Sequence, residues 1–280
     1  MLIAVIVLGA IALVAAAVLF VCSKKFAVKE DPRIAQVSAV LPQANCGGCG
    51  FPGCSGMADA LVKAADGGSL EGLNCPVGGS AVMEQVADLL GMAVANTEPM
   101  VAVVRCNGTC ENRPKTAEYC GLRTCAAMNA CAAGETACGF GCLGCGDCIE
   151  VCQFGAIAIN PETGLPEVNE DLCTACGACA KACPRHIIEL RKKGPKGRRV
   201  YVSCVNRDKG PAAKKACAAA CFGCGKCEKE GPFGAITVEC NLSYIDPLKC
   251  RSCRKCEKVC PTGAIKAVNF PAPKNNPVTE

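Results

Sequence analysis

The sequence predicts an α+β fold that begins with one transmembrane helix, continues as a small, mostly helical module, and ends in two tandem units of short strands and helices. Three observations predict it: an uncharged apolar run opens the chain, cysteine accounts for 29 of the 280 residues, and short apolar strands follow closely spaced cysteine runs. Because aromatic residues make up only 4% of the chain, burial alone gives such small units little stability. Cross-links or metal must therefore hold them together.

The N-terminal run, residues 2–22, carries no charge over 21 residues, which is enough to cross a hydrocarbon core. Lys24 and Lys25 follow the run and no Lys or Arg precedes it, so the positive-inside rule places the rest of the chain in the cytoplasm. A cleaved signal peptide, the alternative, would have a basic start and a shorter apolar stretch. We expect residues 1–26 to be a retained, single-pass anchor in the cytoplasmic membrane.

The cysteines are spaced as metal ligands rather than as a disulfide framework. Most of them fall in C-x-x-C runs, which bring thiolates together at one metal centre. The single histidine, His186, argues against mixed Cys/His zinc sites, while zinc held by four cysteines stays an alternative. The modest net charge of +5 and the scarcity of aromatic residues do not suggest nucleic-acid binding.

The first cysteine module, at 27–100, carries its thiols in the spacing C-x2-C-x4-C-x20-C. These thiols are Cys46, Cys49, Cys54 and Cys75. They satisfy one [4Fe–4S] cluster, and the glycines between them let the backbone wrap closely around it; a structural zinc knuckle is the alternative. Helices are predicted at 55–65 and 79–92. The module is similar to the small iron–sulfur domain in the B subunit of the Rnf complex and in corrinoid iron–sulfur proteins.

A first pair of runs, at 142–152 and 173–184, follows the pattern C-x2-C-x2-C-x3-C of bacterial two-cluster ferredoxins. In that pattern the fourth cysteine of each run ligates the other cluster. One [4Fe–4S] cluster is expected on Cys142, Cys145, Cys148 and Cys183, and the other on Cys173, Cys176, Cys179 and Cys152. Strands are predicted at 155–159 and 186–190. His186 is expected at the surface or as a cap, not as a ligand.

A second ferredoxin-like unit repeats the pattern with one ligand missing. One cluster is expected on Cys221, Cys224, Cys227 and Cys260, and the other on Cys250, Cys253 and Cys256. Gly231 stands where the fourth ligand of the latter would be. Cys240 is the preferred substitute, and the alternatives are Cys204 or Cys217, a three-iron cluster, or a four-iron cluster with a non-cysteine ligand. Strands are predicted at 234–238 and 263–267.

A longer repeat surrounds both units. The spacing of Cys125, Cys138 and Cys142 matches that of Cys204, Cys217 and Cys221, and residues 103–107 resemble residues 201–206, which indicates duplication of the whole unit with its N-terminal extension. A further cluster on Cys106, Cys110, Cys125 and Cys138 is a hypothesis, with free or structural thiols as the alternative. The expected total is five clusters, or six with this one, and one of them is [3Fe–4S] if the Gly231 site is incomplete.

The predicted divisions of the chain follow from these motifs. They are a transmembrane anchor at 1–26, the N-terminal module at 27–100, a cysteine-rich connector at 101–137, the first ferredoxin-like unit at 138–190, a basic linker at 191–215, the second unit at 216–268 and a tail at 269–280. Within the linker, residues 191–199 (RKKGPKGRR) hold six basic side chains in nine. Because donor ferredoxins are typically acidic, this segment is predicted to steer ferredoxin docking, and a solvated linker is the alternative.

The anchor, the NCGGCG module, the segment at 104–110 and the tandem units together resemble the B subunit of the Rnf complex in its longer form. The resemblance implies a component of a translocase, a ferredoxin:NAD⁺ oxidoreductase coupled to Na⁺ or H⁺ transport. Such a component takes electrons from reduced ferredoxin and relays them through its clusters. Its partners would be the other Rnf subunits, soluble ferredoxin and the membrane.

Other classes of protein make different predictions. A polyferredoxin subunit of another membrane redox enzyme, such as a hydrogenase, is the nearest alternative, and co-purifying subunits would identify it. A corrinoid-linked methyl carrier needs a cobalamin-binding domain, for which the cysteine-rich chain leaves no room. A secreted disulfide scaffold would contain no iron. No dinucleotide fingerprint or Ser/His/Asp constellation is found, so no catalytic residue is expected on this chain.

Overall fold

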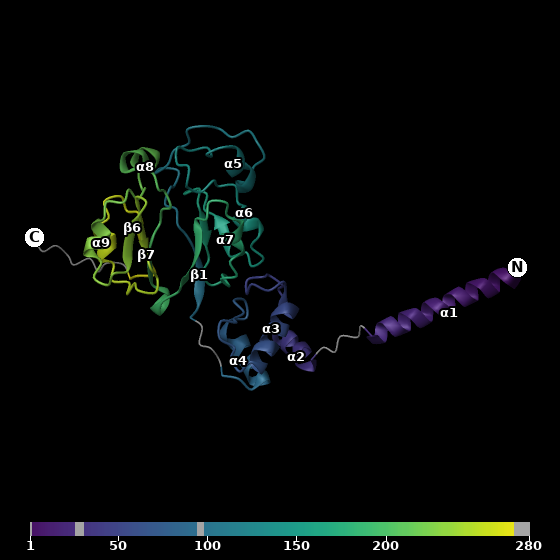
Figure 1. Cartoon of the computed structure of the whole chain (residues 1–280). Helices are drawn as coiled ribbons and strands as arrows, with labels where there is room; N and C mark the ends of the chain where they lie inside the picture. The colour runs from purple at the N-terminus through teal and green to yellow at the C-terminus, as the bar shows by residue number, and fades with distance from the viewer. Residues whose placement is uncertain (1, 26–30, 94–97, 272–280) are drawn as a thin grey trace, which may run out of the picture.

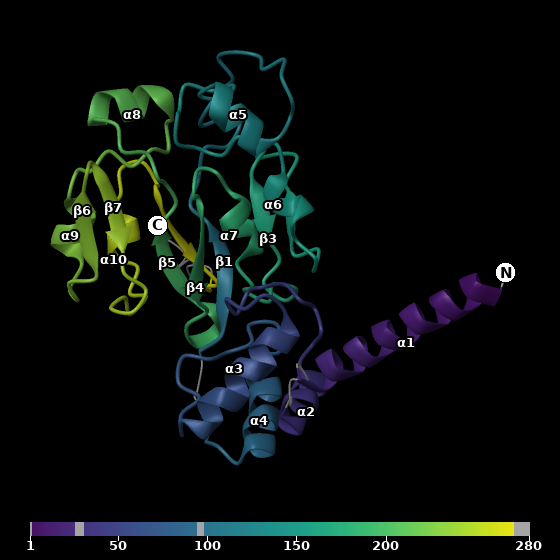
Figure 2. The same ribbon diagram turned by 45° about the vertical axis from the view of Figure 1, so that its right-hand side comes forward.

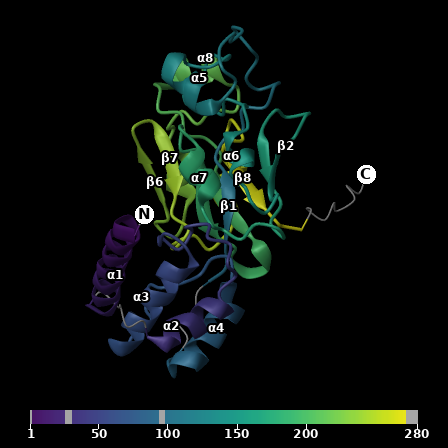
Figure 3. The ribbon, with the colours of Figure 1, turned by 90° about the vertical axis from the view of Figure 1, so that its right-hand side faces the viewer.

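The computed structural model describes residues 2–25, 31–93 and 98–271. Helix α1 (Leu2–Lys25) stands apart from the rest, a bundle of three helices follows it, and two ferredoxin-like units lie side by side beyond the bundle (Figures 1 and 2). The view turned by a quarter shows the bundle beneath the two units (Figure 3).

The transmembrane helix predicted over 1–26 is the part of the fold class that the structure corrects. The segment is helical, as α1, but no helix in the described ranges is both long and apolar enough to cross a membrane. The fold class is α+β, with a helical module and two ferredoxin-like units.

The helical module consists of α2 (Pro32–Val40), α3 (Cys54–Asp66) and α4 (Gly79–Leu90). The last two confirm the predicted helices. Asp31 caps α2 by accepting a 2.8 Å hydrogen bond from the Arg33 amide, and α4 ends at Gly91 because its φ of 66° is a left-handed conformation that suits glycine. The apolar faces of the three helices meet in a core of its own, which includes Val37, Met57, Leu61 and Val86.

The first ferredoxin-like unit is built from two antiparallel strand pairs. Strand β1 (Met100–Val104) pairs with β4 (Ile188–Lys192), and β2 (Ile157–Ile159) pairs with β3 (Pro166–Val168). Short helices follow the cysteine runs: α6 (Asp147–Glu150) and α7 (Ala178–Ala182). The insert between β1 and the first run carries α5 (Cys125–Cys131). His186 is exposed just before β4, as predicted.

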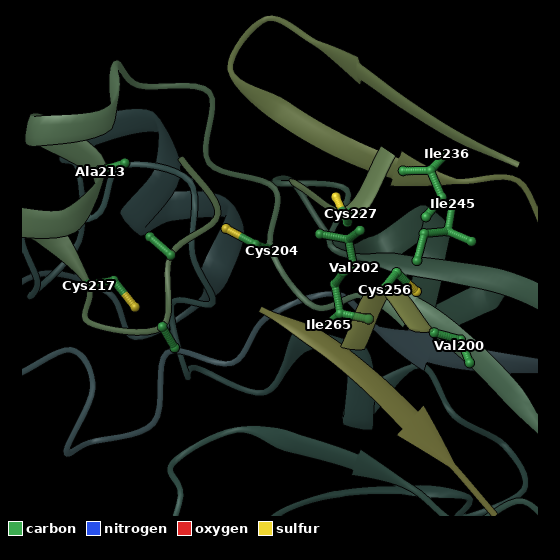
Figure 4. Packing of buried hydrophobic residues seen from close by; sticks show 12 residues of the cluster. Val200, Val202, Cys204, Ala213, Cys217, Cys227, Ile236, Ile245, Cys256 and Ile265 are labelled. Atoms are coloured by element: carbon green, nitrogen blue, oxygen red, sulfur yellow. The ribbon is translucent and has the colours of Figure 1, made fainter. Parts of the chain in front are cut away.

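The second unit has the same plan. Strand β5 (Arg199–Val202) pairs with β8 (Ile265–Val268), and β6 (Ile236–Glu239) pairs with β7 (Leu242–Ile245). Its helices are α8 (Gly210–Ala216), α9 (Lys226–Glu230) and α10 (Lys255–Lys258). Val202, Ile236, Ile245 and Ile265 pack with the cysteines in its core (Figure 4). The four strands predicted after the cysteine runs are all present as β2, β4, β6 and β8, displaced by about two residues.

Duplication is visible in equivalent hydrogen bonds just after the first strand of each unit. The Arg105 amide donates to Ile187 O at 2.7 Å, and the Ser203 amide donates to Ala264 O at 2.7 Å. This alignment makes Cys106 the equivalent of Cys204, since each is the next residue along the chain. The sequence spacing had instead matched Cys204 with Cys125, because the first unit has the longer insert.

The basic segment at 191–199 belongs to the strands of both units rather than to a linker. It runs from β4 through a 3₁₀ turn, η1 (Pro195–Gly197), into β5. Arg191 is 1% exposed and Arg199 is 8% exposed, the latter paired with Glu170. Of its six basic residues only Lys196 is fully exposed. Most of this charge therefore serves the packing of the two units.

A polar network joins the two units across their β-strands. Glu189 of the first unit accepts a 2.7 Å hydrogen bond from the Tyr244 hydroxyl of the second unit and pairs with Arg105 at 3.2 Å. Arg191 lies 3.4 Å from the same carboxylate and places its guanidinium against the rings of Tyr201 and Tyr244, 5.8 and 5.1 Å from their centroids. One carboxylate thus offsets two buried or half-buried cations at the junction.

Replacing Glu189 by alanine is expected to lower the free energy of unfolding by about 3 kcal/mol, because it leaves buried guanidiniums without their counter-charge. The matched control is Lys63→Ala, which breaks the exposed 2.7 Å pair with Asp59 and should cost less than about 1 kcal/mol. Anaerobic denaturant unfolding of the cluster-loaded chain measures both. Equal effects of the two substitutions would show that the network does not hold the units together.

Candidate iron–sulfur cluster sites

The clearest site in the first unit is a cavity that all four predicted thiols line. They are Cys152, Cys173, Cys176 and Cys179. Ala102, Ile157, Val168 and Leu190 form the apolar wall, and the amide of Ala156 donates to Cys152 Sγ at 3.4 Å. Thiols around a dry cavity with an amide aimed at sulfur are what a [4Fe–4S] cluster requires.

The second cavity of this unit is lined by three predicted ligands and one additional thiol. The predicted ones are Cys142, Cys148 and Cys183, and the additional one is Cys125. Cys145 lines the adjoining, larger cavity and is hydrogen-bonded to Cys125. Burial, with the Cys125 thiol close by, raises the pKa of Cys145 to about 11. Cys125 therefore belongs beside the Cys142 site, which its sequence spacing did not indicate.

Asp147 explains why Cys125 lies there. Its carboxylate accepts hydrogen bonds from the backbone amides of Cys125 and Ala126, at 2.7 and 3.0 Å, and so ties the start of α5 to the Cys142–Cys152 run. The Thr124 side chain caps the same helix through the amide of Ala127. The insert is thereby folded back over the site.

The second unit brings its first predicted ligand set together in one cavity. Cys221, Cys224, Cys227 and Cys260 all line it. Val202 and Ile265 form part of the wall, and Cys227 Sγ lies 3.2 Å from the Ser243 hydroxyl. This cavity repeats the crossed ligand pattern of the first unit, with three thiols from one run and the last thiol of the other.

The remaining site of this unit has three thiols around it, and Gly231 stands at the fourth position. Burial, together with Cys250 and Cys253 nearby, raises the pKa of Cys256 to about 11. Cys240 is exposed in the β6–β7 turn, where its neighbour Asn241 lies against Gly223 of the other run. Cys204 and Cys217 line a different cavity. The three substitute thiols considered from the sequence thus lie at other places.

We expect a Gly231→Cys variant to convert a three-iron cluster at this site into a four-iron cluster, adding about one iron per chain. The φ of −76° at Gly231 suits cysteine, and a Cβ there would lie 3.1 Å from Ile236 Cδ1, a side chain that can give slightly. Electron paramagnetic resonance of the oxidised protein follows the loss of the three-iron signal. In the control, Cys240→Ser, the signal should not change; iron loss in that variant would identify Cys240 as the ligand.

In the N-terminal module the structure gathers Cys49, Cys54 and Cys75 at the edge of the helical core, with Cys46 in the adjoining glycine-rich loop. The amide of Gly78 donates to Cys75 Sγ at 3.4 Å. Burial raises the pKa of the Cys75 thiol, and Cys49 and Cys54 lie close enough to raise it further. The start of α3 is fixed from the same loop, because Asn45 accepts a 2.8 Å hydrogen bond from the Cys54 amide.

This glycine-rich loop packs directly on the first ferredoxin-like unit. A Cβ at Gly48 would lie 2.7 Å from the carbonyl oxygen of Cys176 and 2.9 Å from its Cα, so only glycine fits there. Lys181 donates to Gly47 O at 3.5 Å across the same contact. The absence of a side chain therefore brings the N-terminal thiols next to the Cys176 site.

A Gly48→Ala variant is expected to push these two sites apart and to slow electron exchange between them several-fold. Gly210→Ala is the control, because a Cβ there would meet only Phe222, at 3.7 Å. Rapid reduction followed by time-resolved absorbance of the clusters compares the two variants at equal iron content. Identical exchange rates would contradict a direct path through this contact.

The cysteine sets suit iron–sulfur clusters in the protonation of their thiols as well as in their arrangement. In the described part of the chain no three His, Cys, Asp or Glu side chains converge closely enough to hold a single metal ion, whereas the cysteine sets ring cavities. Burial raises the pKa of Cys142 and of Cys148 to about 12, so these thiols carry protons that iron binding displaces. When bound, such clusters supply reversible one-electron storage.

Cysteine-lined cavities repeated through two ferredoxin-like units define this chain as a multi-cluster iron–sulfur electron carrier. Family models agree: a 4Fe-4S dicluster domain matches residues 141–187, an Fe-S cluster domain matches 41–66 and a 4Fe-4S binding domain matches 243–266. A further 4Fe-4S dicluster model matches 172–234 and so overlaps both units. The N-terminal module and both units are thus assigned to iron–sulfur families.

Curated relatives identify the family more closely. The chain is 44% identical to the B subunit of the Na(+)-translocating ferredoxin:NAD(+) oxidoreductase complex of Acetobacterium woodii, over 88% of this chain and 71% of the relative. It is 43% identical to the proton-translocating counterpart of Clostridium ljungdahlii (88% and 84% covered) and 39% identical to the B subunit of the ion-translocating oxidoreductase complex of Methanosarcina acetivorans (87% and 89% covered). This chain belongs to the family of Rnf B subunits, which confirms the resemblance found in its motifs.

Proposed function

We propose that this chain relays electrons from reduced ferredoxin, through its clusters, toward NAD⁺ in a complex that couples this flow to Na⁺ or H⁺ transport. The observation that carries the proposal is the continuity of its cysteine-lined sites: Gly48, in the loop that carries Cys46 and Cys49, packs against Cys176, and the two ferredoxin-like units adjoin each other. Relatives named for Na⁺ and for proton translocation are almost equally similar, so the coupling ion is not assigned.

The donor is proposed to dock on the second unit rather than on the segment at 191–199. Around the exposed thiol of Cys253 lie the basic side chains of Arg251 and Lys255, both exposed. The Arg251 guanidinium lies 5.0 Å from the centre of the Phe233 ring, and Leu248 is 72% exposed nearby in sequence. Positive charge around an apolar rim and an exposed ligand suits an acidic electron donor.

Reversing this charge, with Arg251→Glu and Lys255→Glu together, is expected to lower the ferredoxin association rate by on the order of tenfold at low salt and to flatten its salt dependence. The matched control, Lys214→Glu with Lys215→Glu on α8, changes the net charge equally on another exposed face. Stopped-flow reduction and ferredoxin-dependent NAD⁺ reduction by the purified complex measure the effects. A loss of rate in Lys196→Glu instead would return the docking site to the segment at 191–199.

We further propose that the cluster-bearing part of the chain works on the cytoplasmic side of the cytoplasmic membrane, bound to the other subunits of the complex. The family supports it, because the curated relatives are named as subunits of ion-translocating complexes. Affinity purification from detergent-solubilised membranes tests it. Co-purification with hydrogenase subunits would favour the polyferredoxin alternative.

A further inference from the structure

Four cysteines outside the ferredoxin runs come together between the two units. Cys106 and Cys138 of the first unit and Cys204 and Cys217 of the second line one cavity. Three cavities at the ferredoxin runs are likewise lined by four cysteines each. All four thiols are less than 10% exposed. Figure 4 shows two of them, Cys204 and Cys217, on the loops beside α8, away from Cys227 and Cys256.

The two units contribute to this cavity symmetrically. Cys106 and Cys204 each follow the first strand of their unit by two residues, and Cys138 and Cys217 each precede the next cysteine run by four. The cavity therefore lies on the axis that relates the duplicated units. A group bound on such an axis is held by equivalent residues of both units, and these two pairs of cysteines meet that condition.

Backbone amides donate hydrogen bonds to these thiols in the same pattern as to the thiols of the ferredoxin runs. The amide two residues after Cys204, that of Asn206, donates to its sulfur at 3.4 Å, and Ala219 stands in the same relation to Cys217. In the runs the same pattern occurs at Cys142, with Gly144, and at Cys250, with Ser252 at 3.4 Å. Amide donors of this kind stabilise the negative sulfurs of a bound cluster.

Two polar side chains on the cavity wall have buried atoms without partners. Arg113 is 9% exposed; its Nη2 donates to Cys142 O at 2.7 Å, but its Nε has no hydrogen-bond partner, and within the described residues no carboxylate lies within ion-pair distance of it. Ser203 is 1% exposed and its hydroxyl is likewise unpaired. A buried cation is costly without a counter-charge. An anion in the cavity next to Arg113 would supply this counter-charge. A cluster of iron and sulfide held by four thiolates carries net negative charge.

Two glycines of the cavity wall leave room for the Arg113 guanidinium. A Cβ at Gly108 would lie 2.9 Å from Arg113 Nε, and one at Gly141 would collide with Nη1 of the same side chain. Asn206, itself 1% exposed, donates to Cys138 Sγ at 3.5 Å and so links the thiols of the two units.

We propose that Cys106, Cys138, Cys204 and Cys217 ligate one additional [4Fe–4S] cluster, which bridges the two ferredoxin-like units. This set replaces the one expected from the sequence, because Cys110 is exposed beside Thr163 and Cys125 lies at the Cys142 site.

The bridging site also has a neighbour in each unit. Cys106 lies close enough to Cys142 to help burial raise the pKa of the Cys142 thiol, and Cys221 lies close enough to Cys204 to do the same for the Cys204 thiol. Its role rests on the proposed relay function: the cluster accepts one electron from the neighbouring cluster of one unit and passes one to the neighbouring cluster of the other. Its existence as a metal site does not depend on that function.

The test is metal counting on the anaerobically purified full chain with Cys138→Ser and Cys217→Ser combined. We expect about four fewer irons and four fewer sulfides per chain than in the unmodified protein. The matched control, Cys110→Ser with Cys120→Ser, replaces two exposed thiols and should lose none. Unchanged iron in the first variant, or one zinc lost in place of iron, would overturn the assignment.

A second variant keeps the test decisive if the serine variant folds poorly. Asn206→Leu leaves all ligands in place, so iron content should not change, but loss of its hydrogen bond to Cys138 Sγ should make one cluster harder to reduce in a spectroscopically monitored redox titration. An unchanged set of potentials would contradict a cluster on Cys138. Neither measurement uses ferredoxin or NAD⁺, so failure of the relay proposal would leave both readouts intact.

Discussion

Each cysteine-lined cavity closes only when thiols from two distant segments meet, and the rest of the structure depends on that requirement. Cys152 joins Cys173, Cys176 and Cys179, while Cys183 crosses in the opposite direction to the Cys142 site. Such crossing holds the two halves of a unit against each other and sets strand β1 beside β4. In a chain with 4% aromatic residues, ligation thus supplies what a larger apolar core supplies elsewhere.

The contacts between modules are of a different kind, because they are polar or depend on the absence of a side chain. Glu189 and Arg191 meet Tyr244 across the unit junction, and Gly48 lies against the backbone of Cys176. Neither contact needs a large apolar surface. Modules with small cores can therefore be set at fixed, short separations, which is the property that an electron path requires.

Sequence spacing predicted what is local, namely the ligand runs, the helices at α3 and α4 and the strand after each run. It found that the segments around Cys106 and Cys204 resemble each other, but it did not place the two thiols at one site, because about a hundred residues separate them. It also assigned the charge at 191–199 to solvent, although Arg191 and Arg199 are buried between strands. The helix over 1–26 was predicted as a membrane span, which the described residues do not support.

Crossed ligation also determines the order in which the chain can mature during synthesis. The N-terminal thiols are complete once Cys75 has been made, but the Cys142 site waits for Cys183 and the Cys221 site waits for Cys260. Between Cys142 and Cys183 the growing chain displays reactive thiols without their last partner. Iron delivery to each unit must therefore follow translation of its second half, so a pause between the halves would prolong the exposure of incomplete sites to oxidation.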